Sequence, residues 1–315
     1  MDIKNKIKIC LKALYDEDSR FIIRERLGLC DNLPDDEYLS RMYKIRIGRN
    51  LNLNNPQTFN EKIQWLKLYD RKDIYTLMVD KYLVKDYVAN IIGKEYIIPT
   101  IGVWDNVEEI DFHSLPDRFV LKCNHNSGRG LCICKDKSKF DINKAKIELT
   151  KGLSQNYYYH GREWPYKRVN RKIIAEQYME DDSGELMDYK LMMFNGVFKC
   201  AFTCTERFSS DGLKVTFFDK EWHMMPFERH YPSSKAKIEK PVSYELMIKF
   251  AEKLSKNIPF VRVDFYEVKG KPYFGELTFY PGGGMEEFTP EEWDYKLGSW
   301  INLDGVKQER GMKNV

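Results

Sequence analysis

The sequence predicts a mixed α/β protein of the α+β type, with two lobes and a helical extension at its start. Three observations support this prediction. The 315-residue chain is about twice as long as an ordinary domain and can enclose more than one hydrophobic core. A composition of 43% hydrophobic and 31% charged residues is typical of a folded globular protein. The first 75 residues or so follow a helical pattern, whereas β-rich runs alternate with helical stretches from Arg118 onward.

The N-terminal part is expected to consist of helices. Four runs have helical character: Ile7–Tyr15, Glu37–Gly48, Phe59–Leu68 and Asp73–Ile92. Thr58 stands where an N-cap is needed, directly after a turn-forming Asn-Asn-Pro-Gln segment. The last run carries Lys81 and Lys85 four residues apart, so we expect both lysines on one helix.

The rest of the chain is expected to form strands with helices between them. A short strand ended by proline is predicted first, and a hairpin turned at Lys269–Lys271 is predicted last. The predicted strands are Tyr96–Pro99, Phe119–Lys122, Leu131–Cys134, Ile173–Ala175, Lys190–Phe194, Val197–Cys204 and the hairpin Val261–Leu277. Helices are predicted at Ile142–Leu153 and Tyr244–Leu254.

Charge and hydropathy exclude several classes of protein. The formal net charge is only +3, which disfavours a nucleic-acid-binding protein. No run of about 18 apolar residues is present, so no transmembrane segment is expected. An odd count of seven cysteines, with no signal-peptide pattern ahead of them, favours reduced thiols and a cytoplasmic location.

A lysine beside a glycine-rich loop is the first candidate for chemistry. Lys122 ends a predicted strand and is followed by the loop Asn126–Gly130. Backbone N–H groups and one positive charge can converge there on nucleotide phosphates. The alternative is an ordinary hairpin turn with a solvated lysine.

Two carboxylates on the last hairpin form the second candidate. Strand alternation places Arg262 and Asp264 on one face of their strand, and Glu276 and Thr278 on one face of the next. Carboxylates this close repel each other unless a cation lies between them. Arg262 can supply that cation as a plain salt bridge, but the same oxygens also suit Mg²⁺ with substrate phosphates as further ligands, and we favour Mg²⁺.

Three further segments have features of ligand sites. The segment Pro281–Gly284 permits close approach of its backbone to a ligand. The apolar strand beginning at Ile173 runs into a polar turn that can present backbone groups to an adenine edge. The aromatic and basic stretch Tyr157–Lys172 offers rings for sugar faces and cations for carboxylates, although a partly solvated lid surface explains it equally well.

The order of these segments resembles the ATP-grasp superfamily. Three segments are similar more narrowly to its TupA-like branch, named for teichuronopeptide biosynthesis: Asn55–Lys67, Gly161–Lys167 and Phe274–Gly282. The resemblance runs from about residue 55 to residue 297. It implies an ATP-grasp fold, in which two α+β lobes hold ATP between them.

The resemblance also implies a division of the chain. Residues 1–75 would be the helical N-terminal extension, and 76–117 the helix and linker before the ATP-grasp core. Residues 118–180 would form the lid subdomain, and 181–315 the C-terminal subdomain with the metal site.

Nucleotide-binding residues follow from the same resemblance. Lys81 and Lys122 match the two phosphate-contacting lysines, and the loop residues Ser127, Gly128 and Gly130 match a phosphate cover. The adenine hinge would be Glu176, Gln177, Tyr178 and Met179. Asp188 and Lys190 would face ribose or phosphates, although Glu185 competes with Asp188 for the acidic role.

The metal and catalytic residues are implied in the same way. Asp264 and Glu276 match the Mg²⁺ ligands, and Thr278 stands where the family usually has Asn. This departure weakens the case for a second metal ion, because a neutral hydroxyl is a poorer ligand. Arg262 matches the arginine that faces the reacting groups, with Lys122 and Lys190 as further catalytic cations.

The implied function is an ATP- and Mg²⁺-dependent, ADP-forming ligase that joins a carboxylate to an amine. The TupA-like branch points to a uronic-acid carboxylate of a surface or capsular polysaccharide, or of its precursor, and to an amino acid or amine. The residues expected to meet these substrates are Arg162, Trp164, Tyr166, Lys167, Gly283 and Gly284. Alternatives are a small-molecule kinase on the same fold, a nucleotide-binding regulatory module, and a glycosyltransferase using the acidic triplet Asp16–Asp18.

Overall fold

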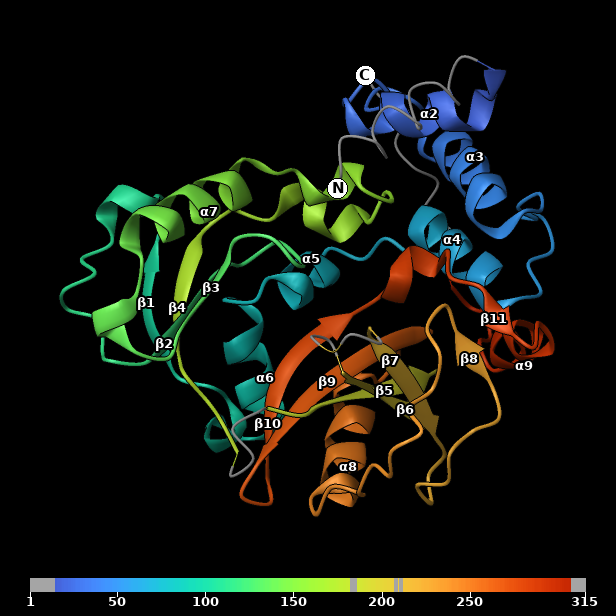
Figure 1. Ribbon diagram of the computed structural model, residues 1–315. Helices are drawn as coiled ribbons and strands as arrows, with labels where there is room; N and C mark the ends of the chain where they lie inside the picture. Colours follow the sequence, from blue (N-terminus) through green and yellow to red (C-terminus); the bar gives the residue numbers. More distant parts are fainter. Residues whose placement is uncertain (1–14, 182–185, 207–208, 210–211, 307–315) are drawn as a thin grey trace.

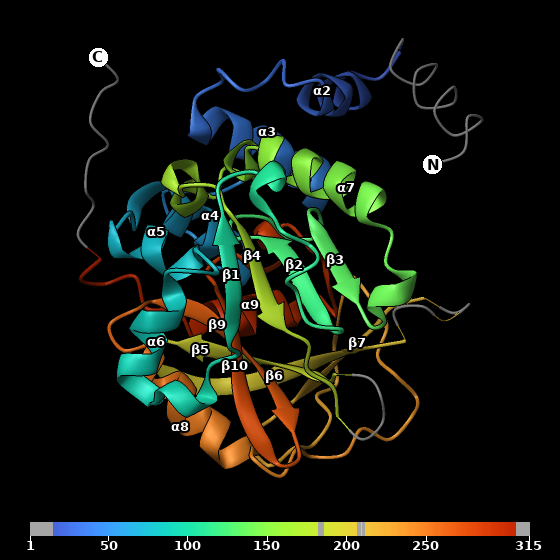
Figure 2. The same ribbon diagram turned by 90° about the vertical axis from the view of Figure 1, so that its left-hand side faces the viewer.

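The molecule is built around two antiparallel sheets, and helices from the N-terminal part lie beside both (Figures 1 and 2). We describe a computed structural model that covers residues 15–181, 186–206, 209 and 212–306. The helix predicted at Ile7–Tyr15 lies outside these residues except for its last position, and the competing Glu185 lies outside them altogether.

The smaller sheet, here called the lid sheet, has four strands. They are β1 (Thr100–Trp104), β2 (Phe119–Cys123), β3 (Leu131–Cys134) and β4 (Ile173–Gln177), in the order β1-β4-β2-β3. Helix α7 (Ile142–Ser154) covers one face (Figure 1), and the two enclose a separate hydrophobic core around Leu121 and Leu149. The lid is therefore a lobe with its own core, as the chain length predicted.

The larger sheet, here called the body sheet, has five strands. They are β5 (Asp188–Phe194), β6 (Val197–Thr205), β7 (Lys214–Phe218), β9 (Phe260–Val268) and β10 (Lys271–Thr278), in the order β10-β9-β5-β6-β7. Helix α8 (Tyr244–Leu254) packs on it with an apolar face. A short ribbon of β8 (Glu228–Arg229) and β11 (Phe288–Thr289), followed by α9 (Glu292–Ser299), completes this lobe.

The N-terminal part supplies five α-helices within the described residues: α2 (Glu17–Arg26), α3 (Asp35–Ile47), α4 (Phe59–Tyr69), α5 (Ile74–Val79) and α6 (Val84–Ile92). Thr58 caps α4 as predicted, because its side chain accepts from the Glu61 amide while the Glu61 side chain reaches back. Helix α4 packs against α9 and belongs to the large core of the body.

Short 3₁₀ turns connect the larger elements. They are η1 (Lys94–Tyr96), η2 (Val107–Glu109), η3 (Lys137–Lys139), η4 (Tyr157–Tyr159), η5 (Trp164–Arg168) and η6 (Pro281–Gly284).

One predicted helix is broken into two. The run Asp73–Ile92 forms α5 and α6, because the Asp80 carboxylate accepts from the amides of Tyr82 and Leu83 and starts a new helix. The prediction that Lys81 lies on a helix is therefore wrong. Lys81 lies in the intervening turn, and its amide donates to the carbonyl of Asn124 in the lid.

The strand predicted at Tyr96–Pro99 is also misplaced. The chain makes a 3₁₀ turn there, and strand β1 begins only after the proline, at Thr100. Because β1 pairs with β4, the lid sheet takes one strand from the segment that the sequence assigned to the linker at 76–117. The strand predictions for β2, β3, β4, β5, β6 and the last hairpin, and the helix predictions for α7 and α8, are confirmed to within two residues.

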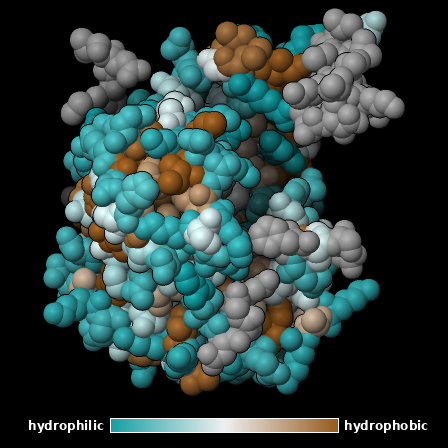
Figure 3. Space-filling view, turned by 60° about the vertical axis from the view of Figure 1, so that its left-hand side comes forward, coloured by the Kyte–Doolittle hydropathy of each residue, from teal (hydrophilic) through white to brown (hydrophobic). Residues whose placement is uncertain are grey.

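Polar residues cover most of the face shown in Figure 3, with smaller apolar patches among them. In the part of the chain that the structure describes, none of the helices has the length and apolar character to cross a bilayer.

Candidate active site between the two sheets

A β-bulge aligns the acidic residues of the last hairpin. Phe274 pairs with Phe265, but Glu276 pairs with Asp264, so Gly275 is the extra residue on β10. A side chain at Gly275 would lie only 3.1 Å from the Asp264 carbonyl oxygen, which explains a glycine at this position. The bulge brings the two carboxylates opposite each other, as strand alternation predicted.

Arg262 lies between these carboxylates. Its Nε and Nη2 donate to the two Asp264 oxygens, both at 2.6 Å, and Nη2 also donates to Glu276 Oε1 at 2.9 Å. Thr278 donates its hydroxyl to the same Glu276 oxygen at 3.0 Å. Asp264 is only 2% exposed, so these contacts form away from bulk water, where they are strong.

Two lysines extend this arrangement. Lys190 Nζ lies 2.5 Å from Asp188 Oδ2 and 2.6 Å from Asp264 Oδ2, and Lys81 Nζ lies 3.4 Å from Glu276 Oε2. We call the six charged residues the ion cluster: Lys81, Asp188, Lys190, Arg262, Asp264 and Glu276. Lys81 also donates to the Asn126 carbonyl at 2.9 Å and so connects the ion cluster to the lid loop.

The charges within the ion cluster keep its members ionised. Burial alone raises the pKa of Glu276, but the charges of Lys81, Arg262 and Lys190 outweigh it and hold this pKa below its ordinary range. Burial lowers the pKa of Lys190, but Asp188 and Asp264 reverse the effect and raise it. Glu276 and Lys190 therefore both remain charged at neutral pH.

A second group of charges lies on the lid. Lys122 Nζ and Lys85 Nζ each lie 2.6 Å from one oxygen of the buried Glu176 carboxylate. Lys122 is thus already paired with Glu176, and the Glu176 carboxylate contacts both lysines.

Tyr266 on β9 connects the two groups of charges. The charge of Asp188, then burial, then the charges of Glu276, Asp264 and Glu176 raise the pKa of its hydroxyl. Its hydroxyl is therefore within electrostatic reach of both the ion cluster and Glu176. Sequence analysis missed Tyr266, although alternation from Arg262 and Asp264 puts it on the same face of the strand.

The predicted adenine hinge follows β4. The Gln177 amide already donates to the Pro99 carbonyl at 3.0 Å, so that group is not available to a ligand. The Tyr178 ring lies against the Arg118 guanidinium at 4.3 Å, and Met179 is half-buried beside it.

The predicted phosphate cover divides into two parts. Ser127 and Gly128 are exposed, with open space around Gly128. Gly130 is instead buried, and its amide donates to Glu148 Oε1 at 3.1 Å. The expectation that Gly130 covers phosphates is therefore corrected, because this glycine lets the loop pack against α7.

Two of the predicted substrate residues lie in the interior of the protein. Arg162 is 1% exposed and donates to the Cys30 carbonyl at 2.7 Å, with its guanidinium 4.3 Å from the Tyr38 ring centre. Its assignment to substrate is corrected, because it ties the segment to the N-terminal helices. Trp164 is likewise buried, in the core beside Tyr75, and is corrected on the same ground.

Two other residues of this segment differ in position. Lys167 is exposed, with its Nζ 4.7 Å from the Tyr158 ring centre. Tyr166 is half-buried against the Tyr157 ring: burial raises the pKa of its hydroxyl, and the charges of Glu163 and Glu276 raise it further.

The glycines after β10 have different surroundings. Gly284 is buried, and a side chain there would lie 2.4 Å from Ile63 Cγ2, so its close approach is to α4. The expectation that Gly284 meets a ligand is corrected. Gly283 has open space at its Cα, and its carbonyl accepts from Lys67 at 2.7 Å.

The donor set fits a hard divalent cation that also binds substrate oxygens. Asp264, Glu276 and Thr278 supply carboxylate and hydroxyl oxygens on neighbouring strands, which is the chemistry that Mg²⁺ prefers. Among the described residues no three His, Cys, Asp or Glu side chains converge on one point. An ion here would need phosphate oxygens to complete its ligands, as Mg²⁺ commonly does with nucleotides.

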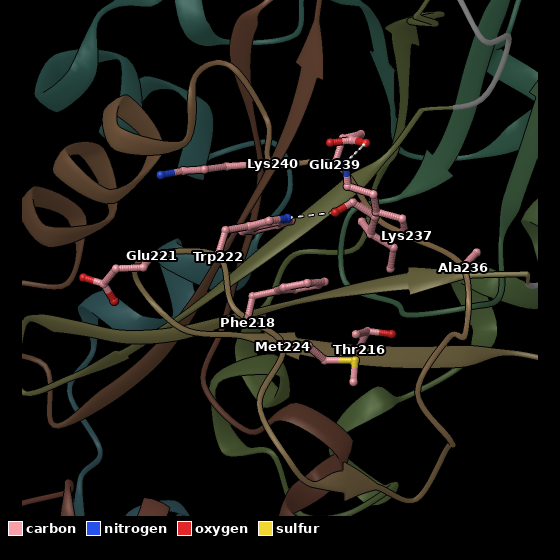
Figure 4. Close-up of a pocket in the computed structure, with 10 residues that line it drawn as sticks. Thr216, Phe218, Glu221, Trp222, Met224, Ala236, Lys237, Glu239 and Lys240 are labelled. Carbon is pink, nitrogen blue, oxygen red and sulfur yellow. Dashed lines mark hydrogen bonds and ion pairs between the residues drawn. The ribbon is translucent and has the colours of Figure 1, made fainter.

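A surface pocket of about 360 Å³ lies elsewhere, at the β7 edge of the body sheet (Figure 4). Phe218 and Trp222 stack in it at 4.1 Å, and Trp222 donates to the Ile238 carbonyl. None of the predicted site residues lines it.

Comparison with known proteins identifies the family of the chain. A family model described as TupA-like ATP-grasp matches residues 61–302, which is most of the chain. The protein therefore belongs to the TupA-like ATP-grasp family and has the ATP-grasp fold. No curated protein matched.

Solved structures give more distant similarities. They include the D-alanine–D-alanine ligase from Bacillus anthracis complexed with ATP (17% identity, 64% of this chain and 54% of that one, TM-score 0.36). The D-alanine–D-alanine ligase from Helicobacter pylori has 14% identity, 79% and 70% coverage and a TM-score of 0.42. The ATP-grasp ligase PsnB, complexed with minimal precursor, Mg and ADP, has 9% identity, 70% and 57% coverage and a TM-score of 0.37. The matched part spans little more than half of the Bacillus enzyme and of PsnB.

Proposed function

We propose that the protein is an ATP- and Mg²⁺-dependent, ADP-forming ligase that joins a carboxylate to an amine. The observation that carries this proposal is the ion cluster, in which Arg262 lies between Asp264 and Glu276 on adjacent strands. Membership of an ATP-grasp family supports ATP as the co-substrate. A buried arginine with two flanking lysines suits a reaction in which negative charge moves between phosphoryl and acyl oxygens.

The reaction would occur in two steps. An acceptor carboxylate oxygen attacks the γ-phosphorus of ATP, the bond from this phosphorus to the bridging oxygen breaks, and ADP leaves with the electron pair. The amine then attacks the carbonyl carbon of the acyl phosphate, and inorganic phosphate leaves. Lys81, Lys190 and Arg262 would stabilise the transferring oxygens, and Lys122 would meet phosphates from the lid side.

Asp264 and Glu276 would hold Mg²⁺, with Thr278 as the neutral third donor. When bound, the ion neutralises phosphoryl charge and acts as a Lewis acid. Arg262, which is paired with both carboxylates here, would face the substrate with its guanidinium when they hold the ion.

The carboxylate substrate is proposed to be a uronic acid of a surface or capsular polysaccharide or its precursor. Membership of the TupA-like branch, named for teichuronopeptide biosynthesis, motivates this choice. Tyr157 and Tyr166 support it further, since their rings contact each other at 4.7 Å and the charge of Glu276 acts on both hydroxyls. Such rings offer flat faces with polar edges, which suit a sugar.

The test is coupled ADP release with glucuronic and galacturonic acids, each combined with a panel of amino acids and simple amines. We expect release that needs both an acid and an amine, and its loss in D264N and K122A. Release of AMP, or no turnover with any pair, would sink the proposal. A stable phosphorylated acid formed without any amine would favour the kinase alternative.

The glycosyltransferase alternative loses support from the structure. Asp16 of the acidic triplet is the N-cap of α2 and accepts from the Ser19 amide at 3.1 Å. Tighter binding of a nucleotide-sugar than of ATP would revive this alternative.

A further inference from the structure

One buried carboxylate beside the ion cluster has no protein partner. Glu163 lies in the turn between η4 and η5 and is only 6% exposed. Throughout the described part of the chain, no hydrogen bond or ion pair reaches its side-chain oxygens. Buried carboxylates are almost always paired, so this one is open to a ligand.

Glu163 lies close to the segment that follows β10: a side chain at Gly161 would be 3.9 Å from both Glu163 Oε1 and Lys67 Nζ, and Lys67 donates to the Gly283 carbonyl. Burial raises the pKa of Glu163, Lys67, Arg262 and Lys81 act to lower it, and Glu276 raises it. The charge of Glu163 is also the largest cause of the raised pKa of the Tyr157 hydroxyl. Glu163 therefore lies within electrostatic reach of the ion cluster.

The nearest cation cannot satisfy Glu163. Lys67 Nζ donates to Gln64 Oε1 at 3.0 Å, to the Gly161 carbonyl at 2.8 Å and to the Gly283 carbonyl at 2.7 Å. An ammonium group has three hydrogens, so these bonds use all of them. Lys67 compensates the charge of Glu163 without donating to it, and the carboxylate lone pairs stay available.

We propose that Glu163 binds the amine substrate in its ammonium form, beside the arginine that faces the acyl group. This inference rests on the proposed ligase function and names the site of its second substrate. A carboxylate here repels both the triphosphate and a uronic acid, so of the three reactants only the amine fits it.

Amide formation would begin with a proton transfer to Glu163. The bound ammonium gives one proton to the Glu163 carboxylate, and the free nitrogen lone pair attacks the carbonyl carbon. The bond from this carbon to the phosphate oxygen breaks, and phosphate leaves with that electron pair and a second proton from nitrogen. The proton on Glu163 passes to solvent, and the neutral amide remains.

The experiment separates the two half-reactions in E163Q. Hydroxylamine is uncharged at neutral pH and converts an acyl phosphate to a hydroxamate without needing an ammonium site. With the best uronic acid from the panel, we expect E163Q to keep the wild-type rate of hydroxamate formation. The KM of the best amino acid should rise about 10- to 100-fold, the effect of one lost buried charge-assisted contact, while the KM of ATP stays unchanged.

The matched control for E163Q is E25Q. E25Q removes a carboxylate from the same neighbourhood, where Glu25 pairs with His160, and should not change the ratio of the two rates. Equal loss of hydroxamate and amide in E163Q, or an unchanged KM for the amine, would overturn the inference while the ligase proposal stands. If E163Q does not fold, E163D, which keeps the charge but draws it back by one methylene, should show a smaller rise in the amine KM with the hydroxamate rate unchanged. No hydroxamate from the wild-type protein with any acid would overturn both.

Discussion

A methyl group added at Gly130 is expected to destabilise the protein, whereas one added two residues earlier, at Gly128, should cost much less. The two glycines belong to one loop and share a left-handed backbone, with φ of +65° and +78°. They differ in their surroundings. A Cβ at Gly130 would lie 2.5 Å from Cys123 Sγ and 3.1 Å from Gly152 Cα, while one at Gly128 meets nothing within 4 Å.

The geometry gives the magnitudes. Both alanines incur the left-handed penalty of about 1–2 kcal/mol. G130A adds an overpacking cost of about 1–3 kcal/mol, since Cys123 and the α7 backbone are buried and cannot move away freely. We therefore expect a loss in the free energy of unfolding of about 1–2 kcal/mol for G128A and about 2–5 kcal/mol for G130A. At ~2 °C per kcal/mol, G130A should melt about 2–6 °C below G128A.

The assay is thermal and urea unfolding of both variants beside the wild-type protein. A third variant, C123A/G130A, removes the sulfur that the new methyl group meets and should recover part of the loss, a non-additive result expected only for touching groups. Equal melting temperatures for G128A and G130A would refute the reasoning. The KM of ATP should respond more to G128A, if the exposed half of the loop covers the phosphates.

Three further predictions concern other parts of the molecule. R262K should lower the rate of ADP release about 100- to 1,000-fold with little change in ATP affinity, because lysine keeps the charge but cannot bridge Asp264 and Glu276. Turnover near the wild-type rate would contradict the role of Arg262. R162A should lower the free energy of unfolding, measured in urea, by about 2–5 kcal/mol, because it empties a buried site. K167A, on the exposed side of the same turn, should change this free energy by no more than about 0.5 kcal/mol. Equal losses in the two variants would contradict the corrected role of Arg162. The hydrogen bond that His160 donates to the Glu25 carboxylate raises the pKa of His160 above 6.5. The stabilisation from this pair is complete below that value and is lost as the pH rises through the raised pKa, so melting at about pH 6 and about pH 8 should show this loss in the wild-type protein but not in H160Q.

Local patterns were sufficient for most of the fold. Helix α4 has a cap, a capping-box partner and an apolar face within a dozen residues, and its predicted bounds differ from the structure by one residue. Strand β1 could not be placed, because it forms only by pairing with β4, more than seventy residues away. The helix break at Asp80 is local, but a carboxylate that caps the next helix looks the same in sequence as one on a continuous helix.

In the site, too, residues related by local patterns could be predicted, and residues that depend on contacts distant in the sequence could not. Arg262, Asp264, Glu276 and Thr278 could be placed together because strand alternation and a hairpin relate them directly. The role of Arg162 depends on carbonyls some 130 residues earlier, at Cys30, and no spacing within its own segment reports that contact. An arginine among tyrosines is typical of a sugar site, and here the tyrosines enclose it in the interior instead.

The charges of the ion cluster explain why a metal ion should accompany the nucleotide. Its three cations, Lys81, Lys190 and Arg262, are matched by three carboxylates, Asp188, Asp264 and Glu276, and the lid lysines share Glu176. A triphosphate at the ion cluster would meet no net positive charge there, and the lid lysines, two against Glu176, would add only one positive charge. A divalent cation held by Asp264 and Glu276 would supply further positive charge. We therefore expect nucleotide binding at this site to depend on charge that the ligand brings with it.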